Sequence, residues 1–263
     1  MSQLSLLIAK DISKRFGGVQ ALADVSFTIN HGEIYGLIGP NGAGKTSLFN
    51  VLTGIYESDG GSFVFDGEPL DRVKPNEVAE RGIARTFQNI RLFQNLSALE
   101  NVMIGRHIRT QAGVFGAILR DKKTLAEEAA IEKRSYELLD YVGVAKRAND
   151  LAKHLAYGDQ RRLEIARALA TEPKLLALDE PAAGMNATET QALKRLLEDI
   201  RRDGTTILLI EHDMKLVMSI CDRVLVLDYG KKIAEGTSAG VQKDPKVIAA
   251  YLGGEVALNL KGT

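Results

Sequence analysis

The stretch GPNGAGKT, at residues 39–46, constrains the fold of this chain more than any other feature. It fits the pattern G-x-x-x-x-G-K-[ST], and it lies between a compact apolar run, EIYGLIG, and a stretch with helical periodicity, TSLFNVLTG. Glycines let the backbone turn so tightly that successive N–H groups point inward at phosphate oxygens, and a helix that follows adds its dipole. The sequence therefore predicts a strand, a phosphate-binding loop and a helix, in that order.

The last two residues of this loop carry side chains suited to a nucleoside triphosphate. The Lys45 ammonium can reach the β- and γ-phosphates, and the Thr46 hydroxyl can ligate Mg²⁺. A chance glycine loop is the alternative interpretation. The strand before the loop and the helix after it favour the phosphate-binding interpretation.

Two acids end the apolar run LLALDE, which we expect to be a buried strand. An acid at the tip of a buried strand is costly unless it meets a cation. Asp179 therefore suits Mg²⁺, and Glu180 is then placed to polarise a water for attack on the γ-phosphate. The alternative for Glu180 is a strand-terminal acid that caps the next turn.

Two single polar residues follow other expected strands. We expect Gln88 to end the strand IARTFQ, where its amide could touch Mg²⁺ and the attacking water, and His212 follows TTILLIE, where its imidazole could hydrogen-bond the γ-phosphate. Alone, each is more often a structural polar terminus, but their order relative to the loop and the two acids favours the functional interpretation. No Asn-Lys pair occurs in the chain, so the guanine-reading motif Asn-Lys-x-Asp of a GTPase is excluded.

The rest of the sequence predicts a single α/β domain. The early segments LSLLIAKDISKRF, ALADVSFTIN and SFVFDGEPL are β-rich, and we expect them to form an antiparallel subdomain. Residues from about Ser97 to Asn149 are mostly helical in pattern, so we expect residues 97–155 to form a helical subdomain, and a helix with an apolar stripe follows LAYG. Strands then alternate with helices, which indicates a mainly parallel core, and DPKVIAAYLG closes the chain as a short helix.

Composition limits the classes of protein that remain. Lys plus Arg and Asp plus Glu each number 34, so the formal charge is zero and a dedicated nucleic-acid binder is disfavoured. The one cysteine, Cys221, excludes an intrachain disulfide and fits a reducing compartment. The four histidines show no metal-ligand spacing, and the opening LSLLIA lacks the flanks of a signal peptide. No apolar stretch approaches the ~20 residues that span a bilayer, so a partner must hold the protein at any membrane where it works.

The order of these motifs resembles that of an ATP-binding-cassette (ABC) ATPase along essentially the whole chain. Phe16 lies where the family has an aromatic residue that stacks on adenine, although a core aromatic is the alternative. LAYGD, at residues 155–159 (the signature segment), stands where the family usually has LSGGQ, and AAGMN, at residues 182–186, matches the D-loop. The resemblance implies a P-loop NTPase (RecA-like) core with an antiparallel β subdomain and an inserted helical subdomain at about 97–160.

The resemblance also implies ligands and roles. ATP and Mg²⁺ are the expected cofactors, and the signature segment contacts the γ-phosphate of the ATP held by the other subunit of a head-to-tail dimer. The implied nucleotide-binding residues are Phe16, Gly39, Pro40, Asn41, Gly42, Ala43, Gly44, Lys45, Thr46, Ser47, Leu155, Ala156, Tyr157, Gly158 and Asp159. The implied metal ligands are Thr46, Gln88 and Asp179, and the implied catalytic residues are Glu180, His212 and Gln88.

A narrower resemblance concerns the longer ATPase subunit of bacterial branched-chain amino acid importers. It is carried by ARTFQNIRLF, LAYGxQRRLEIAR, LDEPAAG, TTILLIEHDMKLVM, the closing AYLG and the helical stretch at 107–150. The implied partners are a second ATPase subunit, identical or a sister, two integral permease subunits and, through them, a periplasmic amino acid-binding protein, with no nucleic acid. The implied place is the cytoplasmic face of the inner membrane.

Other readings of the chain stay open at this point. Urea uptake or lipopolysaccharide export would use a similar ATPase, because this subunit does not touch the cargo. A soluble cassette protein acting on nucleic acid or ribosomes is disfavoured, since the chain has one cassette, no sustained heptads and no basic excess.

Three departures from the family pattern concern the dimer. Ala156 replaces the usual Ser and Asp159 the usual Gln of the signature segment, while Met185 and Ala187 replace the Leu and Pro of the D-loop. We expect Gly158 to open a helix whose free N–H groups bind an anion. The carboxylate of Asp159 is expected near the partner's nucleotide, where it would repel phosphate.

Overall fold

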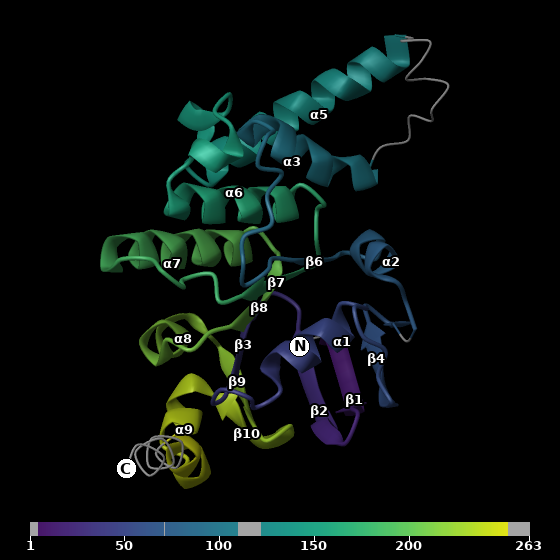
Figure 1. Cartoon of the computed structure of the whole chain (residues 1–263), viewed down its shortest axis with the longest axis vertical. Helices are drawn as coiled ribbons and strands as arrows, with labels where there is room; N and C mark the ends of the chain where they lie inside the picture. Colours follow the sequence, from purple (N-terminus) through teal and green to yellow (C-terminus); the bar gives the residue numbers. More distant parts are fainter. Residues whose placement is uncertain (1–4, 71, 110–121, 252–263) are drawn as a thin grey trace.

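A small antiparallel sheet occupies one side of the molecule. The computed structural model describes residues 5–70, 72–109 and 122–251 (Figure 1). The strands of this sheet are β1 (Ser5–Phe16), β2 (Val19–Asn30), β4 (Gly60–Phe65) and β5 (Glu68–Pro69), in the order β2-β1-β4-β5. Every neighbouring pair is antiparallel, which confirms the prediction for the early strands.

A larger, mostly parallel sheet forms the centre of the fold. Its strands are β3 (Ile34–Ile38), β6 (Ile83–Arg85), β7 (Leu175–Asp179), β8 (Thr206–Ile210), β9 (Arg223–Asp228) and β10 (Lys231–Thr237). Their order is β10-β9-β3-β8-β7-β6, and only the edge strand β10 is antiparallel to its neighbour. The carboxyl ends of the five parallel strands therefore meet at one edge, where α/β proteins bind ligands.

Helices cover the large sheet and extend beyond it. They are α1 (Lys45–Leu52), α2 (Pro75–Glu80), α3 (Ala98–Arg106), α5 (Lys122–Tyr141), α6 (Tyr157–Leu169), α7 (Ala187–Arg202), α8 (Met214–Ile220) and α9 (Ser238–Gln242). Short 3-10 turns lie at His107–Arg109, Ala145–Arg147 and Ala152–His154, and residues 245–251 are helical. Figure 1 shows α3, α5 and α6 gathered at the end of the molecule farthest from α9.

Two hydrophobic cores lie on the two faces of the large sheet. Alternate residues of one strand face opposite cores: Leu175 and Ala177 pack with the small sheet and α1, while Leu176 and Leu178 pack with the helices. This two-residue period explains why residues 175–178 of β7 are all apolar. No helix within the described ranges is long and apolar enough to cross a membrane.

Two element boundaries differ from the predictions. β6 ends at Arg85, so Gln88 lies beyond the strand rather than at its tip, because the backbone N–H of Phe87 donates to the Glu164 carboxylate of α6 instead of to a strand. α6 begins at Tyr157, with Ala156 at its N-cap, so Gly158 is the second helical residue and not the first.

Parts of three predictions lie outside the described residues. These parts are residues 110–121 of the helical stretch, Leu4 at the start of the first β segment, and Leu252 and Gly253 of the closing helix. The helical subdomain at about 97–160 stays a prediction. Within it, α3 and α5 are helical as expected, and α6 starts inside the range and runs on to Leu169.

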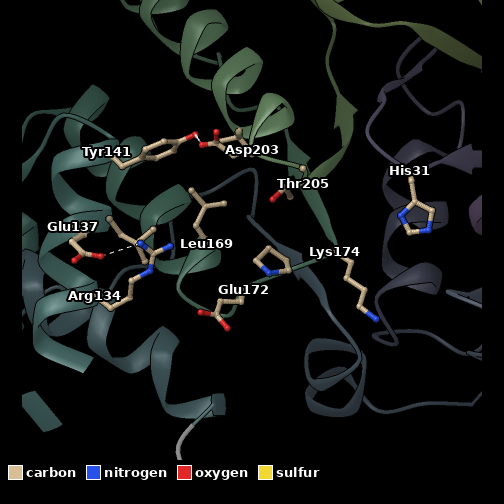
Figure 2. A pocket seen from close by; sticks show the side chains of 13 residues that line it. His31, Arg134, Glu137, Tyr141, Leu169, Glu172, Lys174, Asp203 and Thr205 are labelled. Carbon is tan, nitrogen blue, oxygen red and sulfur yellow. Dashed lines mark hydrogen bonds and ion pairs between the residues drawn. The ribbon is translucent and has the colours of Figure 1, made fainter. Parts of the chain in front are cut away.

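A groove of about 480 Å³ lies at the edge of the large sheet where β7 and β8 begin. Lys174 and Thr205, which immediately precede these strands, line it together with residues of α5 (Figure 2). The Tyr141 hydroxyl at the end of α5 donates to Oδ2 of Asp203 at 2.7 Å. This bond joins α5 to the end of α7, at the edge opposite the phosphate-binding loop.

Candidate functional site

The predicted phosphate-binding loop follows the carboxyl end of β3 and leads into α1. Gly39 and Gly44 have φ angles of 152° and 101°, in the region that favours glycine. A Cβ at Gly39 would collide with the carbonyl oxygen of Leu227, and one at Gly44 would lie 2.6 Å from the carbonyl oxygen of Ala21. Close approach by neighbouring backbone therefore requires glycine at both positions, independently of any ligand.

The side chain of Lys45 lies over the loop from which it starts. Its Nζ donates to the carbonyl oxygens of Gly39 at 2.7 Å and Pro40 at 3.0 Å, and the side chain is buried. Burial lowers the pKa of Lys45, while the nearby charges of Glu180 and Asp179 act in the opposite direction. An ammonium held over these carbonyls is positioned for a phosphate that enters the loop.

A cavity of about 290 Å³ adjoins the loop. Thr46 and Ser47 line it, together with residues 19–21 and Tyr229 in the turn between β9 and β10. Tyr229 is 85% exposed, and its φ of 43° is unusual for a bulky residue. The sequence did not predict that Tyr229 lines this cavity. The one available sign was an aromatic residue directly before the glycine of a tight turn.

The aromatic residue Phe16 lies at the end of β1. It is 40% exposed, and its ring meets the ring of Tyr56 edge-on, with 5.1 Å between the centroids. The Lys14 Nζ lies over the same ring, 5.5 Å from its centroid, so an adenine that stacks on Phe16 must share the ring with this ammonium. The observed exposure disfavours the alternative of a core aromatic.

Glu180, Gln88 and His212 lie together at the carboxyl edge of the large sheet. Gln88 Nε2 donates to Glu180 Oε2 at 3.0 Å, and His212 Nδ1 lies 3.8 Å from the same oxygen. Glu180 follows β7 with a φ of 49°, a strained conformation of the kind that clusters at functional sites. Two side chains that are far apart in the sequence thus converge on one oxygen of the Glu180 carboxylate.

The carboxylate of Asp179 is buried at the end of β7. Burial raises the pKa of Asp179, against the lowering influence of Arg85. Among the described residues, no group of three or more His, Cys, Asp or Glu side chains forms a self-sufficient metal site. The donor set fits Mg²⁺, which is typically held by one or two carboxylates together with substrate phosphates and water.

A second buried acid connects the end of β8 to the D-loop. The carboxylate of Glu211, which directly follows β8, accepts from the backbone N–H of Ala182 at 2.8 Å and of His212 at 3.2 Å. Burial raises the pKa of Glu211. The sequence pointed to His212 alone and not to its neighbour Glu211.

The signature segment leads into the first turn of α6. Gly158 is buried, and a Cβ there would lie 2.9 Å from Oε1 of Glu189 on α7. A Cβ on Gly184 of the D-loop would lie 3.2 Å from the Tyr157 ring. Asp159 in this first turn forms an ion pair with Arg162. The segment therefore packs against the D-loop and the start of α7, and Leu155 is buried behind it.

Comparisons with known proteins cover nearly the whole chain. A family model described as "ABC transporter" matches residues 22–183, and one described as "Branched-chain amino acid ATP-binding cassette transporter" matches residues 231–257. The high-affinity branched-chain amino acid transport ATP-binding protein LivG of Salmonella typhimurium is 44% identical over 254 residues, which are 96% of this chain and 99% of LivG. The corresponding protein BraF of Pseudomonas aeruginosa is 41% identical, covering 94% and 98%.

A more distant relative and two solved structures complete the comparison. The lipopolysaccharide export system ATP-binding protein LptB of Escherichia coli K12 is 34% identical, over 97% of this chain and 100% of LptB. A nucleotide-free ATP-binding cassette of an ABC transporter superposes with a TM-score of 0.82 at 31% identity, covering 94% and 99%. The ADP conformation of the cassette MJ1267 superposes with a TM-score of 0.82 at 30% sequence identity, over 95% of this chain and 99% of MJ1267. These likenesses confirm the predicted fold class.

Proposed function

Because the chain belongs to the family of ABC transporter ATP-binding proteins, we propose that it is the ATP-hydrolysing subunit of a branched-chain amino acid importer. The convergence of Gln88 and His212 on the Glu180 carboxylate, beside the phosphate-binding loop, is the observation that carries the hydrolytic part. Branched-chain amino acids are supported as the cargo by the relatives LivG and BraF and by the match at residues 231–257.

The roles of the loop residues follow from their positions. The N–H groups of residues 41–46 and the ammonium of Lys45 bind the β- and γ-phosphates, and the ring of Phe16 stacks on the adenine. Thr46, Asp179 and Gln88 would hold Mg²⁺, which when bound neutralises charge on the phosphate oxygens. Buried Asp179 is the strongest candidate among these ligands, since a carboxylate removed from water needs a cation.

The chemistry is the attack of a water on the γ-phosphate, which breaks the bond to the β–γ bridging oxygen and releases ADP and phosphate. Glu180 orients this water and accepts its proton, and the Gln88 amide holds the carboxylate in place through the bond to Oε2. The His212 imidazole, whose Nδ1 lies 3.8 Å from the same Oε2, hydrogen-bonds the γ-phosphate oxygens. In this scheme the signature segment, residues 155–159, contacts the nucleotide of a second ATPase subunit in a head-to-tail dimer.

The partners follow from membership of the family. We infer two permease subunits in the inner membrane, with this chain bound to their cytoplasmic face and a periplasmic amino acid-binding protein on the other side. Lipopolysaccharide export is the less favoured cargo, because LptB is 34% identical whereas LivG is 44% identical. Purification of the complex from native membranes, with identification of the integral subunits, tests this part.

Glu180→Gln tests the hydrolytic role directly. The variant should bind MgATP and lose hydrolysis by ~10²–10⁴-fold, because an amide cannot accept the proton of the attacking water. It should accumulate as an ATP-bound dimer on a sizing column. Glu137→Gln, at an exposed ion pair on α5, is the control and should keep full hydrolysis. Near-normal turnover by Glu180→Gln would remove Glu180 from its proposed role.

A further inference from the structure

α6 carries two buried charged side chains shortly after the signature segment. Arg161 is 2% and Glu164 1% exposed, and Arg161 Nη1 lies 3.3 Å from Glu164 Oε2. A buried ion pair gains little by itself, because the loss of water offsets the attraction unless further hydrogen bonds satisfy both groups. Both side chains therefore need further hydrogen-bond partners.

The further hydrogen bonds of this pair go mainly to the backbone of residues 87–91, here called the Gln88 segment. Arg161 Nη1 donates to the carbonyl oxygen of Phe87 at 2.7 Å, and its Nη2 donates to that of Gln88. In return, Glu164 Oε1 accepts from the backbone N–H of Phe87 at 3.4 Å and of Arg91 at 3.3 Å. The Gln88 segment is thus fastened to α6 at three residues.

The same guanidinium also reaches the signature segment. Arg161 Nη2 donates to the Tyr157 hydroxyl at 3.1 Å, one helical turn earlier. The side chain of Gln88, in contrast, leaves the clamp and donates to Glu180 at the edge of the large sheet. Gln88 is therefore held by its backbone to α6 and by its amide to the proposed catalytic carboxylate.

We propose that Arg161 and Glu164 act as a positioning clamp that couples the Gln88 segment to the signature segment. When α6 moves, the Gln88 amide moves with it, so Glu180 is held correctly only in one position of the helix. Arg161 and Glu164 touch neither nucleotide and act through Gln88. The inference rests on the proposed function, in which Gln88 serves the ATP of its own subunit and the signature segment serves the ATP of the partner.

The clamp then links the two ATP sites of the dimer. Engagement of the signature segment by one nucleotide fixes α6, and α6 fixes the Gln88 amide at the other nucleotide. One feature disfavours a purely stabilising role: Arg161 Nε is buried without a hydrogen-bond partner, which costs stability. Apolar side chains of similar volume often replace such a pair without loss of stability.

The decisive variant is Arg161→Met/Glu164→Leu, which removes both charges together and leaves neither buried alone. We expect it to fold and to keep the affinity of the isolated subunit for ADP. Its kcat should fall by about 10- to 100-fold at little change in KM, because a small displacement of a catalytic amide costs that much. The Hill coefficient for ATP should fall towards one, and amide exchange in residues 87–91 should become faster.

The matched control is Arg134→Met/Glu137→Leu, which removes an Arg–Glu pair of the same spacing from the surface of α5 (Figure 2). It should leave kcat and the Hill coefficient unchanged. If the decisive variant does not fold, Arg161→Lys replaces it, because one ammonium cannot make all the contacts of the guanidinium with Phe87, Gln88, Tyr157 and Glu164. Its kcat should lie below that of the wild type, and an unchanged kcat would overturn the clamp.

The outcomes separate this inference from the proposed function. Faster exchange in the Gln88 segment with unchanged kcat and Hill coefficient overturns the clamp, since the segment would then be free without consequence. Unchanged exchange overturns it as well, because the segment would not depend on α6. A wild-type protein that does not hydrolyse ATP contradicts the proposed function itself and not the clamp alone.

Discussion

At the scale of single residues, Asp159 has a neighbour that changes its expected effect. Its carboxylate pairs with Arg162 three residues later, so part of its charge is neutralised before a partner's nucleotide approaches. The other adjacent arginine, Arg161, is committed to the Gln88 segment and cannot assist. The ion pair is partly exposed, and such i,i+3 pairs contribute only ~0.2–0.5 kcal/mol, so repulsion of phosphate is reduced but remains.

Asp159→Gln should therefore tighten ATP-driven dimerisation, by up to about tenfold or ~1.4 kcal/mol. The change removes a negative charge near phosphate, and the gain should shrink at high salt. Dimerisation is measured by sizing chromatography in the Glu180→Gln background, at low and high salt. Arg162→Gln, which exposes the full charge of Asp159, should shift the equilibrium the other way. Equal dimerisation in all three proteins at low salt would place Asp159 away from the nucleotide.

The residues of the site differ in how readily the sequence predicts them. The phosphate-binding loop and the Asp179–Glu180 pair are predictable, because parallel strands bring their carboxyl ends to one edge. The burial of Arg161 is not predictable from QRRLEIARALA, since the apolar stripe of a helix does not distinguish an arginine beside it from one in solvent. Only the arrival of the Gln88 segment on that side of α6 decides it.

At the scale of elements, the packing of α3 on α6 depends on one glycine. A Cβ on Gly105 would collide with the backbone carbonyl of Arg167 and lie 3.2 Å from Cβ of Ala170. The two helices approach this closely because Gly105 has no side chain. The relative position of α3 and α6, and with it the position of the signature segment, therefore depends on this crossing point.

Gly105→Ala should destabilise the protein by about 1–3 kcal/mol, because overpacking forces the two helices apart. Thermal or urea unfolding measures the loss. Gly236→Ala in β10 is the control: its new Cβ would lie 4.0 Å from Cγ2 of Val241, an ordinary contact, so stability should stay unchanged or rise, because glycine inside a strand costs conformational entropy. Equal stability of Gly105→Ala and wild type would show that the crossing can widen without cost.

The elements themselves follow from hydrophobic periodicity more closely than their ends do. Residues 175–178 of β7 and 207–210 of β8 each form a short buried apolar run that predicts a central strand. β6 ends three residues before its predicted end, because the N–H of Phe87 donates to a carboxylate on α6 instead of to β7. Such competition arises from a segment some eighty residues away, and local sequence carries no sign of it.

At the scale of the whole molecule, the site lowers the stability of the fold that carries it. Asp179 is 4% exposed at the end of a central strand, and burial raises the pKa of its carboxyl. In the pH range between its ordinary and its raised pKa, the folded state binds more protons than the unfolded state. Stability therefore falls as pH rises through this range, by about 1.4 kcal/mol for each unit by which the pKa is raised.

Asp179→Asn should accordingly stabilise the nucleotide-free protein at neutral and higher pH, as measured by urea unfolding in the presence of a chelator. The difference from wild type should close as pH is lowered below the ordinary pKa of a carboxyl, where the folded and the unfolded states are both protonated. Glu80→Gln, on the exposed side of α2, should change stability at neither pH.

With saturating MgATP the wild type should instead be more stable than Asp179→Asn. A ligand that binds only the folded state stabilises it, and the amide is a poorer ligand for Mg²⁺ than the carboxylate. A variant less stable than wild type at every pH without nucleotide would mean that attraction to Arg85 outweighs the cost of burial. Asp179 would then be a structural residue of the sheet before it is a metal ligand.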